Sequence, residues 1–158
     1  MKILDLITIS LITGIIGSLT GVISLVWHVK NNRPKVVPKY HTGFIDLSGT
    51  GKDMQHIFSI NFSNPTKHRI VVSSAGISFK NKNYLHFIGN NDGFPKVLLQ
   101  GDSHVVYRNI DFIKKAIDEN GSPNYVWVRD ATGKLYKGSV RKMIKNVEAM
   151  YKVKHNKK

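Results

Sequence analysis

The stretch HIFSINFSN, from His56 to Asn64, decides how the rest of this chain is interpreted. Its apolar residues Phe58, Ile60 and Phe62 alternate with polar residues at positions 59, 61 and 63. A period of two places alternate side chains on opposite faces, which is typical of a half-buried β-strand. The following Asn64-Pro65-Thr66 is a turn signal. The stretch therefore predicts a strand of a sheet with one buried face.

Further short strands follow, separated by polar turns, at residues 69–72, 75–79, 84–88, 104–110, 125–129 and 135–138. A short helix is predicted from Asp111, as its cap, to Asn120, with Gly121 at its end. Apolar residues recur at helical spacing near the C-terminus, at Val140, Met143, Ile144, Val147 and Met150. About seven short strands with one inserted helix favour a mainly β fold, an immunoglobulin-like sandwich with a C-terminal helix, and leave a barrel as the alternative.

The N-terminal segment is strongly apolar. No Asp, Glu, Lys or Arg occurs between Leu6 and Val29, and a helix of that length spans roughly 36 Å, enough to cross a hydrocarbon core of about 30 Å. A cleaved signal peptide would have a shorter apolar core followed by a small-x-small site, whereas this run ends at Trp27-His28. We therefore expect an uncleaved single-pass anchor in the cell membrane.

The side of the membrane that the C-terminal part faces is less sharply indicated. Lys30, Arg33, Lys35 and Lys39 follow the apolar run, so the positive-inside rule favours a cytoplasmic domain. The short N-terminal tail also contains Lys2, as in signal anchors with an exported domain, and both orientations stay open.

Small residues form one stripe along the predicted membrane helix. Their spacing of four, three, four and three keeps them on a single face, and they are Ser10, Gly14, Gly17, Gly21 and Ser24. Small residues let helices approach closely in lipid, and Gly17 to Gly21 is a GxxxG pair. The stripe predicts association of the helix with itself or with another membrane protein; the alternative is that Gly is simply common in membrane helices.

The chain carries a formal charge of +14, from 24 Lys and Arg against 10 Asp and Glu. Lys2 and Asp5 are the only charged residues before Lys30, so the whole excess lies in the C-terminal part. Such a domain attracts polyanions, among them nucleic acid, anionic lipid and wall polymers. The best basic cluster, predicted to contact an anionic surface, consists of Arg141, Lys142, Lys145, Lys152, Lys154, Lys157 and Lys158. The alternative is that these side chains form a solvated face without a partner.

The sequence holds no motif of a catalytic or cofactor site. It has no cysteine, its seven histidines form no HxxxH or HExxH pair, and it has no Gly-rich phosphate loop. Asp130-Ala131-Thr132-Gly133 is interpreted as a hairpin turn between two strands. We expect neither enzymatic activity nor a bound metal or cofactor.

These features divide the chain into a transmembrane anchor (1–30), a linker (31–38), an immunoglobulin-like β domain with a C-terminal helix (39–151) and a basic disordered tail (152–158).

Several of these segments carry a resemblance to known proteins. They are the segment from Asn64-Pro65-Thr66 through Ile70-Val71-Val72 to Ala75-Gly76-Ile77, then Leu99 to Ser103, the helix from Asp111 to Asn120, and Val126 to Lys134. The pattern resembles small prophage and bacterial single-pass membrane proteins with an immunoglobulin-like domain. In size and layout the chain is similar to the lactococcal-type superinfection-exclusion proteins.

The resemblance implies a binding and blocking protein that excludes a second phage by interfering with entry of its DNA. Expected partners are the membrane, a second helix, phage DNA or a tail protein, and an anionic lipid or polymer. The resemblance supplies no functional residues. The alternative function is an envelope adaptor whose basic β domain docks a membrane, wall or protein partner.

Overall fold

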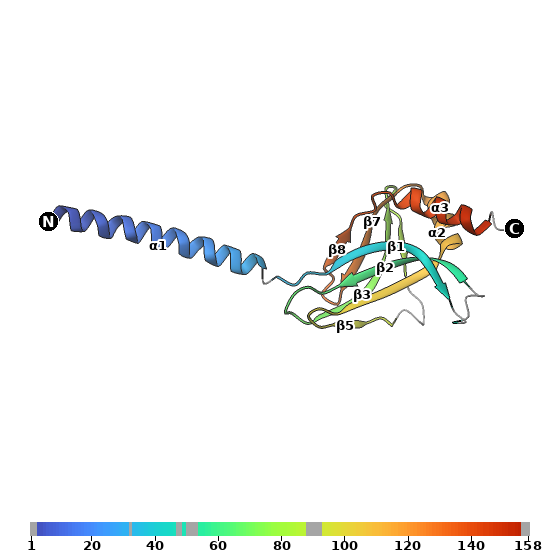
Figure 1. Cartoon of the computed structure of the whole chain (residues 1–158), viewed down its shortest axis with the longest axis horizontal. Helices are drawn as coiled ribbons and strands as arrows, with labels where there is room; N and C mark the ends of the chain where they lie inside the picture. The colour runs from blue at the N-terminus through green and yellow to red at the C-terminus, as the bar shows by residue number, and fades with distance from the viewer. Residues whose placement is uncertain (1–2, 32, 47–48, 50–53, 88–92, 156–158) are drawn as a thin grey trace. The chain divides into compact units, whose positions relative to one another are not determined.

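The computed structural model describes residues 3–31, 33–46, 49, 54–87 and 93–155 (Figure 1). Contacts divide the chain into two units, Met1–Arg33 and Pro34–Lys158. The first unit contains helix α1 (Ile3–Asn31). Within it, Leu11–Val29 is long and apolar enough to cross a membrane, with a mean hydropathy of 1.7. The helix is therefore compatible with membrane anchoring. A signal sequence meets the same criteria of length and composition.

The second unit is a sandwich of two antiparallel sheets. The first sheet has the order β1-β2-β6 and contains β1 (Val37–Asp46), β2 (Met54–Ser63) and β6 (Ser103–Asn109). The second has the order β4-β3-β7-β8, with β3 (Ile70–Phe79), β4 (Tyr84–His86), β7 (Pro123–Asp130) and β8 (Leu135–Gly138), and with β5 (Lys96–Leu98) paired to β3. These are the A-B-E and C′-C-F-G orders of an immunoglobulin sandwich. The predicted fold class is confirmed.

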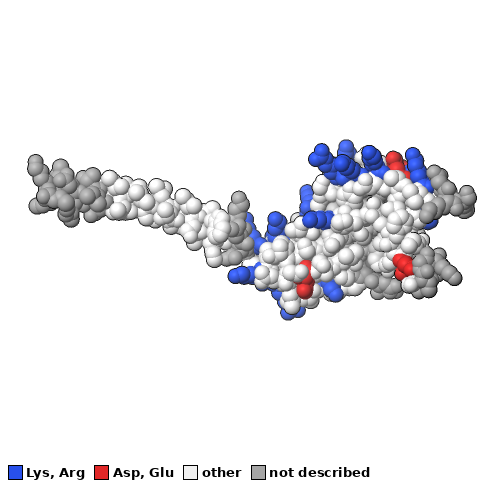
Figure 2. All heavy atoms as spheres, in the orientation of Figure 1, with Lys and Arg blue, Asp and Glu red and all other residues white. Residues whose placement is uncertain are grey.

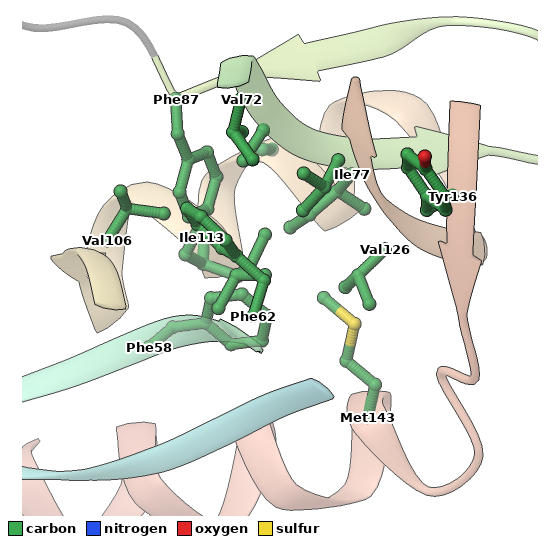
Figure 3. Close-up of a cluster of buried hydrophobic side chains, with 14 of the residues drawn as sticks. Phe58, Phe62, Val72, Ile77, Phe87, Val106, Ile113, Val126, Tyr136 and Met143 are labelled. Carbon is green, nitrogen blue, oxygen red and sulfur yellow. The ribbon is translucent and has the colours of Figure 1, made fainter. Parts of the chain in front are cut away.

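The core lies between the two sheets. Phe58, Ile60 and Phe62 of β2 are fully buried, which confirms the alternation that predicted this strand. They face Ile77 of β3 and Val126 of β7 in one continuous cluster (Figure 3). Because this cluster lies wholly within the second unit, the sandwich has a core of its own.

The predicted break in strand β3 at Ser73-Ser74 is wrong. The strand is continuous, and its pairing with β7 shifts register between Val72 and Ser74. This bulge changes the parity of the strand, so that Val72 before it and Ala75 after it are both buried in the core. The extra residue therefore keeps the apolar side chains on both sides of the bulge directed into the core.

The predicted linker over 31–38 is too long, because Val36 and Pro38 are buried and β1 begins at Val37. The sequence pattern does not predict β1 or β5. β1 pairs with β2 alone, at the edge of its sheet, and it contains Pro38 and Gly43, which are depleted in strands. Pro38 is the one buried residue of β1, so the strand lacks the regular apolar alternation that identifies β2.

Helix α2 (Ile110–Asn120) connects the two sheets between β6 and β7. Its cap is Asn109, whose side chain accepts a hydrogen bond from the Asp111 backbone N–H at 3.0 Å; the predicted cap at Asp111 is wrong by two residues. Gly121 ends the helix with φ of 78° and donates its N–H to the Ile117 carbonyl at 2.7 Å.

Helix α3 (Met143–His155) packs beside α2 (Figure 1). Met143 and Val147 are buried and Met150 packs against the core, and Figure 3 shows Met143 among the core side chains. The predicted docking face is confirmed for these three residues. Val140 also packs against the core but precedes the helix, and Ile144 is not part of the core cluster. The helix continues through Lys152 to His155, so the predicted disorder of the tail is wrong for these residues. Residues 156–158 lie outside the described part of the chain.

Candidate functional site

The small-residue stripe lies along one face of α1. For Ser10 the structure describes only the backbone; Gly14, Gly17, Gly21 and Ser24 are exposed. Apart from the helix's own backbone, no described atom lies within 4 Å of a Cβ built on any of these three glycines. The stripe is therefore bare within the described part of the chain, and its predicted role in helix association stays a prediction.

Four residues of the predicted basic cluster form one exposed surface, which we call the α3 surface: Arg141, Lys142, Lys145 and Lys152. Lys145 and Lys152 are seven residues apart on α3, away from the buried Met143 and Val147. Figure 2 shows Lys and Arg side chains gathered along the side of the domain that carries α3. Like charges gathered on one face raise the local concentration of an anionic partner.

The turn that begins the α3 surface is fixed to the sandwich. The Arg141 N–H donates to Ser139 Oγ at 3.2 Å, and the Tyr40 hydroxyl of β1 donates to the Arg141 carbonyl at 2.5 Å. Tyr40 also stacks on Phe58 with ring centroids 5.8 Å apart. Burial raises the pKa of Tyr40 above its ordinary value, although a hydrogen bond with Asn146 opposes this. The hydroxyl therefore stays protonated and the turn is held in place.

Beside this turn lies a hollow of about 280 Å³, lined by Pro38, Lys39, Tyr40, His41, Ser139 and Arg141. Lys39 and Arg141 supply two cations, and no acidic side chain lines the hollow. Sequence reasoning missed Lys39 and His41 as part of this surface. They lie about a hundred residues before Arg141, and no local pattern links them to it.

Lys154 does not belong to the α3 surface. Its ammonium forms an ion pair with the Asp111 carboxylate of α2, and His155 Nε2 lies 3.3 Å from the other carboxylate oxygen. Burial by itself would raise the pKa of Asp111, but the hydrogen bonds from Lys154 and His155 lower it below its ordinary value. Lys154 thus links the two helices, and the predicted contacts at Lys157 and Lys158 lie outside the described residues.

The Asp130 carboxylate accepts four hydrogen bonds. Its Oδ1 accepts from Thr132 N, Thr132 Oγ1 and Lys134 N at 2.9, 2.6 and 3.0 Å, and its Oδ2 accepts from the Tyr136 hydroxyl at 2.9 Å. Burial works against ionisation, yet these hydrogen bonds hold the pKa of Asp130 below its ordinary value.

Burial and the hydrogen bond to Asp130 together raise the pKa of Tyr136 to about 12. A hollow of about 250 Å³ lies beside this turn, but both carboxylate oxygens already accept hydrogen bonds, Oδ1 from the turn and Oδ2 from Tyr136 of β8. The arrangement is that of a turn anchor between β7 and β8, as the sequence predicts. Among the described residues no group of three or more His, Asp or Glu is placed to hold a metal ion.

Comparisons with known proteins add no family. No family model matches the chain, and no curated protein matches it. One solved structure, described as the X-ray structure of Northeast Structural Genomics Consortium target SoR45, aligns with 68% of this chain and 82% of its own, at 12% identity and a TM-score of 0.28. A similarity this low carries no argument about fold or function.

Proposed function

We propose that this chain is a membrane-anchored binding protein, without catalytic activity, whose β-sandwich contacts a phosphate-bearing polyanion through the α3 surface. The observation that supports the proposal is the gathering of Arg141, Lys142, Lys145 and Lys152 on one exposed face beside the hollow that contains Lys39. Phosphate contacts release counterions and make binding depend steeply on salt. The apolar helix α1 would hold the domain at the membrane.

The test uses the full chain in neutral detergent micelles and a fluorescent DNA duplex. The triple variant Arg141→Gln, Lys145→Gln, Lys152→Gln should weaken binding, and the slope of log affinity against log salt should fall by up to about 2.7, from about 0.9 per lost phosphate contact. The control triple variant Lys67→Gln, Arg69→Gln, Lys115→Gln removes the same charge from exposed sites elsewhere. Equal weakening by both triples would show that net charge, and not the α3 surface, is responsible.

The biological role that we propose is superinfection exclusion by a prophage-type protein that interferes with entry of phage DNA. The layout of an apolar N-terminal helix before a basic sandwich supports this proposal, together with the resemblance in the sequence. Expression in a sensitive host should reduce plaquing while phage adsorption stays normal. Unchanged plaquing across a broad phage panel would remove the support for exclusion, and reduced adsorption would indicate a block at the cell surface instead.

The position of the gene separates this role from that of an envelope adaptor. A place beside a prophage repressor and integrase favours exclusion, and a place within an envelope operon favours the adaptor.

A further inference from the structure

The outer face of the five-stranded sheet, which points away from the core, carries rings and cations from three strands. Pairing registers place Tyr84, Ser78 and Tyr125 in one row, and His86, Gly76, Trp127 and Lys137 in the next, with Arg129 paired to Ser74 beyond them. Helices α2 and α3 pack mainly on β1, β2 and β6, and Tyr84 is 49% exposed. We call the following set the aromatic face: Tyr84, His86, Tyr125, Trp127, Arg129 and Lys137.

The members of the aromatic face contact one another as a single layer. The Tyr84 and Tyr125 hydroxyls are 3.4 Å apart, and the Trp127 ring meets Tyr84 and His86 edge to face, with centroids 6.2 and 4.9 Å away. Lys137 Nζ lies 4.4 Å from the centroid of Tyr125, and Arg129 Cζ lies 5.8 Å from that of Trp127. Each cation therefore lies beside a ring of this layer.

Strand β3 contributes only small side chains beneath this layer. A Cβ on Gly76 would lie 2.8 Å from the Trp127 ring and 2.0 Å from the Leu85 carbonyl, so glycine lets the indole lie flat against the strand. Trp127 is 1% exposed, and its Nε1–H has no hydrogen-bond acceptor among the described residues. A buried indole donor without an acceptor is uncommon in folded proteins, and a stabilising core position would normally satisfy it.

The chemistry of the aromatic face selects among ligands. The outward side chains of β3, β4, β7 and β8 include no Asp or Glu, because Asp130 is buried in its turn. A face that bound neutral sugars would need acceptors for their hydroxyl groups, whereas this one offers cations, phenol groups and rings. Surfaces that bind single-stranded nucleic acid combine two features: cations that pair with the phosphates along its backbone, and rings on which its bases stack.

We propose that the aromatic face binds single-stranded nucleic acid, with a base stacked on Tyr84 and His86 and the phosphates paired with Arg129 and Lys137. Duplex DNA is a poorer fit, because its grooves admit a helix or a two-stranded ribbon and its bases are not exposed for stacking. The aromatic face and the α3 surface share no residue. Either proposal therefore stands if the other fails.

The test measures fluorescence anisotropy of a labelled oligo(dT) 12-mer with the full chain in neutral detergent micelles. Tyr84→Leu should weaken binding about five- to 150-fold, the range for loss of one base–ring stack. Its matched control is Tyr107→Leu, which removes an equally exposed ring (45%) from the outer face of the other sheet and should leave affinity unchanged. Lys137→Gln, at an exposed edge position, should lower the salt slope by about 0.7 without touching the core.

Two further ligands make the result decisive. An abasic 12-mer has the same charge without the bases, and a duplex has the bases already stacked. If the abasic strand binds much more weakly than oligo(dT), and if Tyr84→Leu weakens binding of oligo(dT) but not of the abasic strand or the duplex, the proposal is supported. Equal affinity for the abasic strand, or equal effects of Tyr84→Leu and Tyr107→Leu in variants that melt cooperatively, would overturn it. The α3-surface triple variant should weaken binding of the duplex. When Tyr84→Leu is added to that triple variant, it should weaken oligo(dT) binding by the same factor as in the otherwise unsubstituted chain.

Discussion

At the scale of single residues, Asp130 shows how one side chain stabilises a turn and responds to pH. Its carboxylate accepts four hydrogen bonds from Thr132, Lys134 and Tyr136. The pKa of Asp130 in the folded chain lies below the ordinary value of 3.8. The stabilisation from ionised Asp130 is therefore complete above about pH 4 to 5 and is lost as pH falls through the folded pKa.

We predict that Asp130→Ala lowers the free energy of unfolding by about 1–3 kcal/mol, because buried donors lose their acceptor. Asp130→Asn keeps an acceptor for Thr132 and Lys134 but cannot ionise, so it should cost less at pH 7 and should reduce the loss of stability on acidification. Thermal denaturation at pH 7 and pH 3 measures both effects. Unchanged melting of Asp130→Ala at pH 7 would contradict the role of the turn.

Gly138 marks the place where the edges of the two sheets approach. A Cβ on Gly138 would lie 2.2 Å from the Pro38 carbonyl and 2.8 Å from Val126 Cγ2. We predict that Gly138→Ala destabilises the domain by about 1–3 kcal/mol, because backbone must move to admit the methyl group. Gly43→Ala is the control, since nothing lies within 4 Å of its Cβ. Chemical denaturation should separate the two variants; similar midpoints would show that β1 and β8 adjust freely.

At the scale of elements, α1 combines an apolar surface with a stripe of small residues. We predict that Gly17→Leu with Gly21→Leu keeps the helix in the membrane but prevents close approach of a second helix. The double control Ser18→Leu, Thr20→Leu changes two small residues off the stripe. A membrane-association assay in cells should lose its signal only with the first pair. Survival of both association and biological activity in that variant would mean that the stripe reflects composition alone.

The last turn of α3 contributes contacts as well as charge. Lys154 and His155 both reach Asp111 of α2, so we predict that deletion of residues 152–158 lowers the melting temperature by a few degrees, as expected for loss of a partly exposed ion pair worth about 0.5–1 kcal/mol. Deletion of residues 156–158 alone should leave the melting temperature unchanged. Equal melting of the two truncated chains would show that the link between the helices adds nothing to stability.

At the scale of the whole molecule, the two units differ in what stabilises them. Among the residues whose burial the structure describes, the core residues, from Val36 to Val147, all lie in the second unit. We predict that a fragment of residues 34–158 is soluble and unfolds cooperatively, while the full chain of 17.8 kDa resists carbonate extraction from membranes at its intact mass. Mass spectrometry of the membrane fraction measures this. Recovery of a shortened, soluble chain would identify α1 as a cleaved signal sequence.

Local sequence patterns were enough to predict the elements in which buried residues recur at a regular spacing. The alternation at Phe58, Ile60 and Phe62 predicts β2, and the spacing of Met143 and Val147 predicts the docking face of α3. They were not enough for β1, in which Pro38 is the one buried residue, or for the bulge after Val72, which only the pairing with β7 explains.

The sequence by itself determined that the chain has an apolar N-terminal helix, a mainly β domain and a strongly basic C-terminal part, because these follow from composition and from periods of a few residues. Only the tertiary structure decided which distant side chains share a surface. Lys39 and Arg141 line the same hollow. The Trp127 ring contacts both Tyr84 and Arg129. The physical reason is that strand pairing joins segments far apart in the chain, and the register of each pair is set by packing of the common core.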